Sequence, residues 1–191
     1  MDFKKNLELL NQIDNPSWKR ILFSGLLSQS VIEKGYPAPI IVGGEAVEIY
    51  TNGQYTTGDI DIKGNLSCIA EILEHAGFHR NHGVFYHSEL DLAIDWLGGN
   101  LEQGEEAENR AINIKVREKL YIRVISVEDL IVDRLCAAKF WADKESEQWA
   151  KILWEVKSDL DMGYLLKRAS EEDVEDITKE LFNISTDPKA R

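Results

Sequence analysis

Residues 40–62 read IIVGGEAVEIYTNGQYTTGDIDI, with a glycine pair after the first apolar run and two aspartates in the second. Ile40 to Val42 form a short, continuous apolar run, which is typical of a buried strand. Gly43 and Gly44 then precede a short helical pattern over 45–50. Glycines at such a turn let the backbone approach a phosphate and direct N–H groups toward it. The stretch predicts a strand, a glycine turn and a helix, followed by a second strand.

Two carboxylates occupy the second predicted strand, residues 59–62. Because successive side chains alternate across a strand, Asp59 and Asp61 are expected on one face. Neighbouring carboxylates repel each other unless a cation lies between them. Mg²⁺ is commonly held by one or two carboxylates together with substrate phosphates. An isolated Asp-x-Asp also fits a solvated strand edge, so the surrounding sequence decides between the two interpretations.

A hydroxyl and a third carboxylate lie near these aspartates in the predicted order of elements. Thr57 precedes Asp59 by two residues, and its hydroxyl suits a phosphate oxygen, although a β-branched residue entering a strand needs no ligand. Asp95 lies inside the apolar run 92–97, where an unpaired carboxylate is costly to bury. Asp91, just before that run, is the alternative. We favour Asp95 because a carboxylate inside an apolar strand is costly to bury unless it binds a partner.

The remaining pattern predicts an α+β fold, with a mixed β-sheet flanked by helices and a helical C-terminal part. Predicted helices cover 7–13, 17–34, 66–75, 126–138, about 146–157, 162–168 and 171–182; extended runs cover 84–86, 92–97, 111–116 and 120–124, and 98–108 reads as a loop. We expect N-terminal helices over 1–36 that pack on the core, an α/β core over 37–125 and a helical part over 126–191.

Composition limits the partners of this 191-residue chain, whose formal net charge is -12. Its basic residues are scattered, so broad nucleic-acid binding is not expected, although a local contact with RNA remains compatible with the charge. No stretch approaches the roughly 20 apolar residues that cross a bilayer, so no membrane partner is expected. The N-terminus lacks the features of a secretory signal, which favours a cytoplasmic location.

Together, residues 41–46 (Ile-Val-Gly-Gly-Glu-Ala) and 57–61 (Thr-Gly-Asp-Ile-Asp) resemble the signature of the nucleotidyltransferase superfamily. The resemblance implies that fold and a Mg²⁺-dependent (or Mn²⁺-dependent) enzyme. Such an enzyme moves a nucleoside monophosphate from an NTP to an acceptor, which could be RNA, protein or a small molecule. The residues implied to grip phosphates are Gly43, Gly44 and Thr57, and those implied to bind catalytic metal are Asp59, Asp61 and Asp95.

Residues 126–150 resemble the helical segment of small prokaryotic nucleotidyltransferase-like proteins related to the toxins of type IV toxin–antitoxin and abortive-infection systems. In those toxins a basic residue on this helix reaches the triphosphate. Arg134 matches that position, and Lys139 is a neighbouring candidate. Ordinary ion pairs on a helix surface are an equally good explanation of Arg134. The resemblance also implies a toxin-type activity and a cognate antitoxin as a partner.

Two positions depart from the pattern of the superfamily. Tyr55 stands four residues before the first metal aspartate, where the family often has arginine or lysine. Glu45 follows the glycine pair, where a small or hydroxylated residue is common in the toxins. An acid beside a phosphate cradle weakens its attraction for a nucleotide. The alternative function is therefore a catalytically inactive relative that senses nucleotides or binds another protein.

Overall fold

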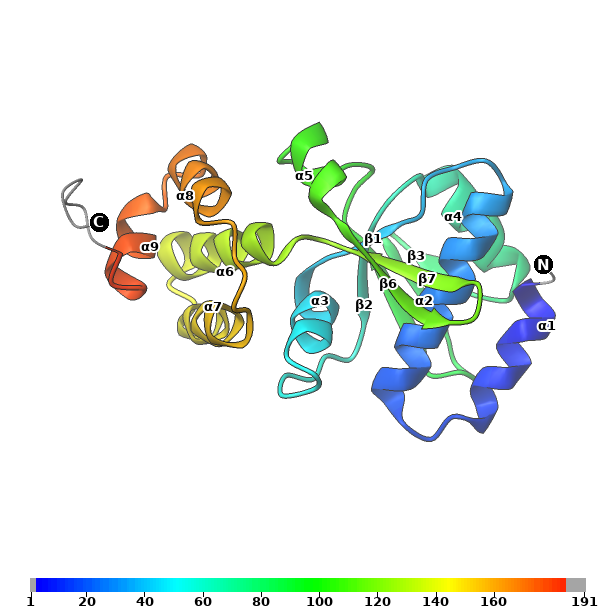
Figure 1. Ribbon diagram of the computed structural model, residues 1–191. Helices are drawn as coiled ribbons and strands as arrows, with labels where there is room; N and C mark the ends of the chain where they lie inside the picture. Colours follow the sequence, from blue (N-terminus) through cyan, green and yellow to red (C-terminus); the bar gives the residue numbers. More distant parts are fainter. Residues whose placement is uncertain (1–2, 185–191) are drawn as a thin grey trace. The chain divides into compact units, whose positions relative to one another are not determined.

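The computed structural model describes residues 3–184. The chain divides between Ile125 and Ser126 into two compact units, residues 1–125 and 126–191. The first unit holds the sheet and the second is helical (Figure 1).

A seven-stranded mixed sheet forms the centre of the first unit, in the order β3-β4-β5-β2-β1-β7-β6. Its strands are β1 (Ile40–Ile41), β2 (Ile60–Lys63), β3 (His79–Asn81), β4 (Val84–His87), β5 (Leu92–Trp96), β6 (Ile112–Arg117) and β7 (Leu120–Val124). The pairs β1–β7 and β2–β5 are parallel, and the other pairs are antiparallel. This sheet and its flanking helices confirm the predicted α+β class.

The register gives the sheet one apolar face. Ile41 pairs with Ile62, and Ile60 pairs with Ile94, so these side chains point to the same side. All four are at most 2 % exposed. The opposite face carries Asp61 and its partner Asp95, whose side chains are only half-buried. Alternation along β2 therefore separates the core from the polar groups, as the sequence predicts.

Helices cover the strands of the first unit (Figure 1). They are α1 (Phe3–Leu7), a 3₁₀ turn η1 (Glu8–Gln12), α2 (Pro16–Glu33), α3 (Gly43–Tyr50), α4 (Leu66–His75) and α5 (Glu105–Arg110). α2 contacts both β7 and α4. At its start the Asn15 side chain accepts a hydrogen bond of 2.8 Å from Trp18 N, and Pro16 occupies the first turn.

The second unit contains α6 (Val127–Trp141), α7 (Lys144–Val156), α8 (Met162–Glu171) and α9 (Glu175–Leu181). Ser126 caps α6 by accepting a hydrogen bond from Asp129 N. The buried Asp129 carboxylate accepts a hydrogen bond of 2.9 Å from the Tyr164 hydroxyl and lies 3.4 Å from Nε of Arg168. Polar groups of α6 and α8 thus satisfy one another inside this unit.

Three local predictions were wrong. The predicted loop 98–108 contains the start of α5, which begins after Gly104 at φ 82° and buries only Ala107, so it shows no apolar stripe. Strand β2 begins at Ile60, which leaves Asp59 just outside it. The predicted helix 171–182 is interrupted, because Asp173 adopts φ 57° and α9 starts only at Glu175.

Among residues 3–184, no helix combines the length and the apolar character needed to span a membrane.

Candidate active site on the polar face of the sheet

The glycine turn lies directly against Asp61. Gly44 N donates a hydrogen bond of 2.8 Å to Oδ2 of Asp61, and Val42 N donates one of 3.0 Å to its carbonyl oxygen. Gly43 has φ 54°, and a Cβ atom added there would lie only 2.8 Å from Cγ of Asp61. Both its backbone conformation and this close approach require glycine. The predicted phosphate turn and the predicted metal ligand therefore meet at the start of α3.

Asp95 stands beside Asp61 on the neighbouring strand. The two residues are direct partners in the parallel pair β2–β5, so their side chains leave the same face of the sheet. Asp91 lies instead in the turn before β5, exposed and at φ 49°. Of the two alternatives for a third carboxylate, the structure places Asp95 next to Asp61.

Thr57 lies between Asp59 and the glycine pair. Its hydroxyl donates a hydrogen bond of 2.7 Å to Oδ1 of Asp59. A Cβ atom added at Gly44 would lie 3.1 Å from Oγ1 of Thr57 and 3.2 Å from the hydroxyl oxygen of Tyr55. Thr57 and Tyr55 therefore approach the first turn of α3, and Tyr55 places a neutral hydroxyl group there.

A buried arginine links α2 to α3 beneath this turn. Arg20 donates hydrogen bonds from Nε to Oε2 of Glu45 (2.7 Å) and from Nη2 to Oε2 of Glu48 (2.6 Å). The three side chains are 7 %, 1 % and 3 % exposed. Oε2 of Glu48 also accepts a hydrogen bond of 2.8 Å from Thr57 N, and its Oε1 accepts one from the Ser17 hydroxyl. Glu45 is thus turned into the interior, where it is paired with Arg20.

Sequence reasoning did not identify Arg20. The available signal was an arginine within the apolar pattern of 17–34, combined with two acids three residues apart in the helix 45–50. An acid inside an apolar helix needs a cationic partner.

Burial raises the pKa of Glu45 from its ordinary value of 4.5 to about 7. The Arg20 guanidinium opposes this rise in pKa, whereas the nearby carboxylates of Glu48 and Asp61 add to it. The largest cause is desolvation, because a buried carboxyl group loses the water that stabilises its charged form.

The raised pKa predicts that wild-type stability falls between pH 5 and pH 8. The unfolded chain releases the Glu45 proton near 4.5, whereas the folded chain keeps it up to about 7, so folding is favoured most below 4.5. The shift corresponds to a loss of about 3 kcal/mol across this window. Chemical denaturation at several pH values measures it. Glu45→Gln should flatten the dependence by a similar amount, and an unchanged pH profile in that variant would refute the assignment.

Arg134 and Lys139 lie in α6 of the second unit, where both form ion pairs. Arg134 Nη2 donates a hydrogen bond of 2.6 Å to Oδ2 of the adjacent Asp133. Lys139 Nζ lies 2.9 Å from Oδ1 of Asp176 and donates a hydrogen bond to the carbonyl of Asp173. Both basic groups therefore have acidic partners within their own unit.

The carboxylates of the polar face have the donor chemistry that Mg²⁺ prefers. Among residues 3–184, no three or more histidine, cysteine or acidic side chains form a group placed to hold a metal ion. Protein sites for Mg²⁺ commonly use only one or two carboxylates, with substrate phosphates and water completing the shell. The adjacent Asp61 and Asp95 on β2 and β5 meet that requirement.

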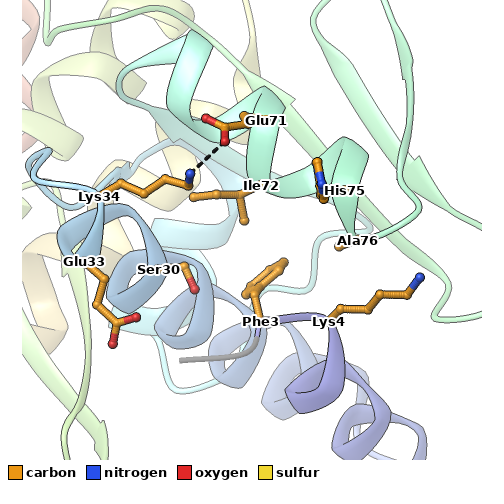
Figure 2. A pocket seen from close by; sticks show the side chains of 9 residues that line it. All are labelled: Phe3, Lys4, Ser30, Glu33, Lys34, Glu71, Ile72, His75 and Ala76. Atoms are coloured by element: carbon orange, nitrogen blue, oxygen red, sulfur yellow. Dashed lines mark hydrogen bonds and ion pairs between the residues drawn. The ribbon is translucent and has the colours of Figure 1, made fainter.

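A cavity of about 630 Å³ lies elsewhere in the first unit, between α1, α2 and α4 (Figure 2). Phe3, Ile72 and Ala76 provide its apolar lining, and the ion pair of Lys34 with Glu71 stands at its edge. None of the predicted site residues lines it. It is therefore separate from the glycine turn and the aspartates.

Comparisons with known proteins support the fold. The chain is similar to the crystal structure of an antigenic nucleotidyltransferase-like protein from Paracoccidioides brasiliensis, with a TM-score of 0.53 and 10% sequence identity. The match covers 88% of this chain and 93% of that one. No family model and no curated protein matches the sequence. The fold is nucleotidyltransferase-like, as the glycine and aspartate motifs predict.

Proposed function

We propose that the protein is a Mg²⁺- or Mn²⁺-dependent nucleotidyltransferase that moves a nucleoside monophosphate from an NTP to an acceptor. One observation supports this most strongly. The glycine turn packs closely on Asp61 and donates a hydrogen bond to it, and Asp95 pairs with Asp61 on the neighbouring strand β5. This proximity supports the proposal, because backbone amides that could bind phosphate and carboxylates that could bind a metal lie together on the polar face of the sheet.

Some of the site residues would bind the nucleotide, and others would activate the acceptor. The backbone amides at the start of α3 and the Thr57 hydroxyl would bind phosphate oxygens. Asp61 and Asp95 would hold the metal together with the substrate phosphates, and Asp59 would join them by exchanging its hydrogen bond with the Thr57 hydroxyl for the ion. The bound metal would stabilise the negative charge that develops on the transferred phosphoryl group. Gly44 N donates its single hydrogen to Oδ2 of Asp61, so this hydrogen bond would break when that amide binds a phosphate oxygen.

In the transfer itself, an acceptor oxygen forms a bond to the α-phosphorus while the bond from that phosphorus to the bridging oxygen breaks. Pyrophosphate leaves with the bonding electron pair. Asp95 would take the proton of the attacking hydroxyl. This role fits its position on the half-buried polar face beside Asp61.

The proposal also includes the two basic residues of α6. Arg134 and Lys139 would bind the triphosphate after exchanging their present acidic partners for phosphate oxygens. The resemblance of 126–150 to the toxins supports a toxin-type activity, with a cognate antitoxin as a partner. Growth arrest on expression, relieved by a small neighbouring gene, would test that part.

Thermal unfolding with each NTP and either Mg²⁺ or Mn²⁺ tests the nucleotide site. A ligand that binds only the folded state stabilises it by about 2.7 kcal/mol at a hundred times its Kd. We expect a metal-dependent rise in Tm with at least one NTP, abolished by EDTA. The variant Asp91→Asn should retain the rise, since Asp91 lies in an exposed turn. A chain that shows no rise with any NTP would contradict the proposal.

A second candidate is a nucleotide-sensing or protein-interaction module without catalysis. Tyr55 favours it, because a neutral hydroxyl stands near Gly44 where a cation would assist phosphate transfer. Tight NTP binding without consumption of the nucleotide would favour this candidate over the enzyme.

A further inference from the structure

A small polar cavity lies on the same face of the sheet as Asp61, beyond it along β2. Its volume is about 230 Å³. Lys63 and Arg123 both pair with Ile40, so their side chains leave the sheet on one side. Tyr36, Asn65, Gly99 and Asn100 complete the polar lining. The volume is below the range of about 300–1,000 Å³ typical of drug-sized ligands, so the cavity suits a compact group.

Two basic side chains, Lys63 and Arg123, line this cavity in a chain of net charge -12, together with the acid Glu108. Lys63 is 6 % exposed and donates hydrogen bonds to the Leu97 carbonyl (2.9 Å) and to Oε1 of Glu102 (2.5 Å). The Glu102 side chain is 72 % exposed, so this carboxylate lies largely in solvent. An ammonium has three donors, and one of the three on Lys63 is left for a ligand.

Arg123 is half-buried, and no carboxylate of the described residues lies within ion-pair distance of it. Its Nη2 donates a hydrogen bond to the carbonyl oxygen of Glu108. The Glu108 carboxylate also borders the cavity, but it accepts a hydrogen bond of 3.2 Å from Leu101 N. A guanidinium presents five donors in a fixed fork, so most of those on Arg123 remain for an anion.

We propose that this cavity binds the phosphate group of a small phosphomonoester, between Lys63 and Arg123. A phosphate offers three strong acceptor oxygens and nearly two negative charges at neutral pH. It matches a planar guanidinium fork and an ammonium better than a singly charged carboxylate does. Binding would displace Glu102, whose side chain lies largely in solvent, from the buried Lys63, and the phosphate would replace its negative charge.

If the proposed nucleotidyltransferase function is correct, the position of the cavity indicates which substrate carries the phosphate. Lys63 follows Asp61 by two residues on β2, which corresponds to about 7 Å along the strand. A phosphomonoester held here would extend its hydroxyl-bearing part toward Asp61 and Asp95. The phosphate would then belong to the acceptor.

Titration of the full ¹⁵N-labelled chain with inorganic phosphate at constant ionic strength tests the site without nucleotide or metal. We expect saturable shifts in the amide signals of Gly64, Gly99 and Asn100, and no comparable shifts with acetate. Arg123→Gln should weaken binding at least tenfold. Arg117→Gln, on the same hairpin and outside the cavity, should leave binding unchanged.

Glu102→Gln provides an independent test, because it changes an exposed side chain and is expected to leave folding unchanged. Removing the competing carboxylate should tighten phosphate binding about threefold or more. Absence of saturable shifts at these amides, or equal phosphate affinity in wild type, Arg123→Gln and Glu102→Gln, would overturn the proposal. Because the titration contains no NTP, a failure of the proposed enzyme activity leaves this result standing, and the reverse also holds.

Discussion

Replacing Asp61 with asparagine is expected to reduce metal-dependent nucleotide transfer by at least about 10²–10³-fold. The substitution removes the charge that would hold the metal. An asparagine oxygen can still accept the hydrogen bond that Gly44 N makes with Asp61, so the glycine turn keeps its closure. Release of pyrophosphate from the NTP that raises the Tm measures the loss.

Asp91→Asn is the matched control for this experiment. It makes the same chemical change at an exposed turn, and asparagine tolerates the left-handed conformation found there. Wild-type rates in Asp91→Asn together with a loss in Asp95→Asn would select Asp95 as the third carboxylate. Full activity in Asp61→Asn would refute the assignment of the metal site.

Arg20→Met is expected to lower the free energy of unfolding by about 3–5 kcal/mol. The variant leaves the carboxylates of Glu45 and Glu48 buried without the cation that they share. It also loosens Glu48, which accepts the hydrogen bond from Thr57 N. The loss should be smaller at pH 5 than at pH 8, because Glu45 is protonated below its raised pKa of about 7. Chemical denaturation at both pH values measures the difference.

Lys34→Met makes the equivalent change in an exposed ion pair. Lys34 and Glu71 have side chains that are 40% and 59% exposed, so the expected loss in the free energy of unfolding is much smaller than in Arg20→Met. Equal losses in Arg20→Met and Lys34→Met would contradict a structural role for the buried arginine.

Local patterns predicted the part of the site that is contiguous in sequence. Gly43 and Gly44 mark a turn whose backbone needs glycine, and Ile60 and Ile62 fix the face that Asp61 occupies. The helix predicted over 17–34 and the extended runs predicted over 111–116 and 120–124 are also present, as α2, β6 and β7, because local patterns determine them. These features suffice for the fold class.

Contacts between distant segments could not be predicted in the same way. The pairing of Asp61 with Asp95 depends on the register of two strands far apart in the chain. Arg20 meets Glu45 across 25 positions, and the cavity beside Lys63 requires Arg123 from β7. Each of these charged side chains stands within or beside an apolar run, and only the tertiary fold identifies its partner.

Paramagnetic NMR with Mn²⁺ and the NTP selected by thermal unfolding tests the central claim most directly. Mn²⁺ broadens amide signals near the ion, so the full ¹⁵N-labelled chain reports where the nucleotide-bound metal lies. We predict that the signals of Gly43, Gly44, Asp61 and Asp95 broaden first, and that Asp61→Asn removes the effect. If these four signals stay sharp while others broaden, the nucleotide and metal bind elsewhere and the proposed site is wrong.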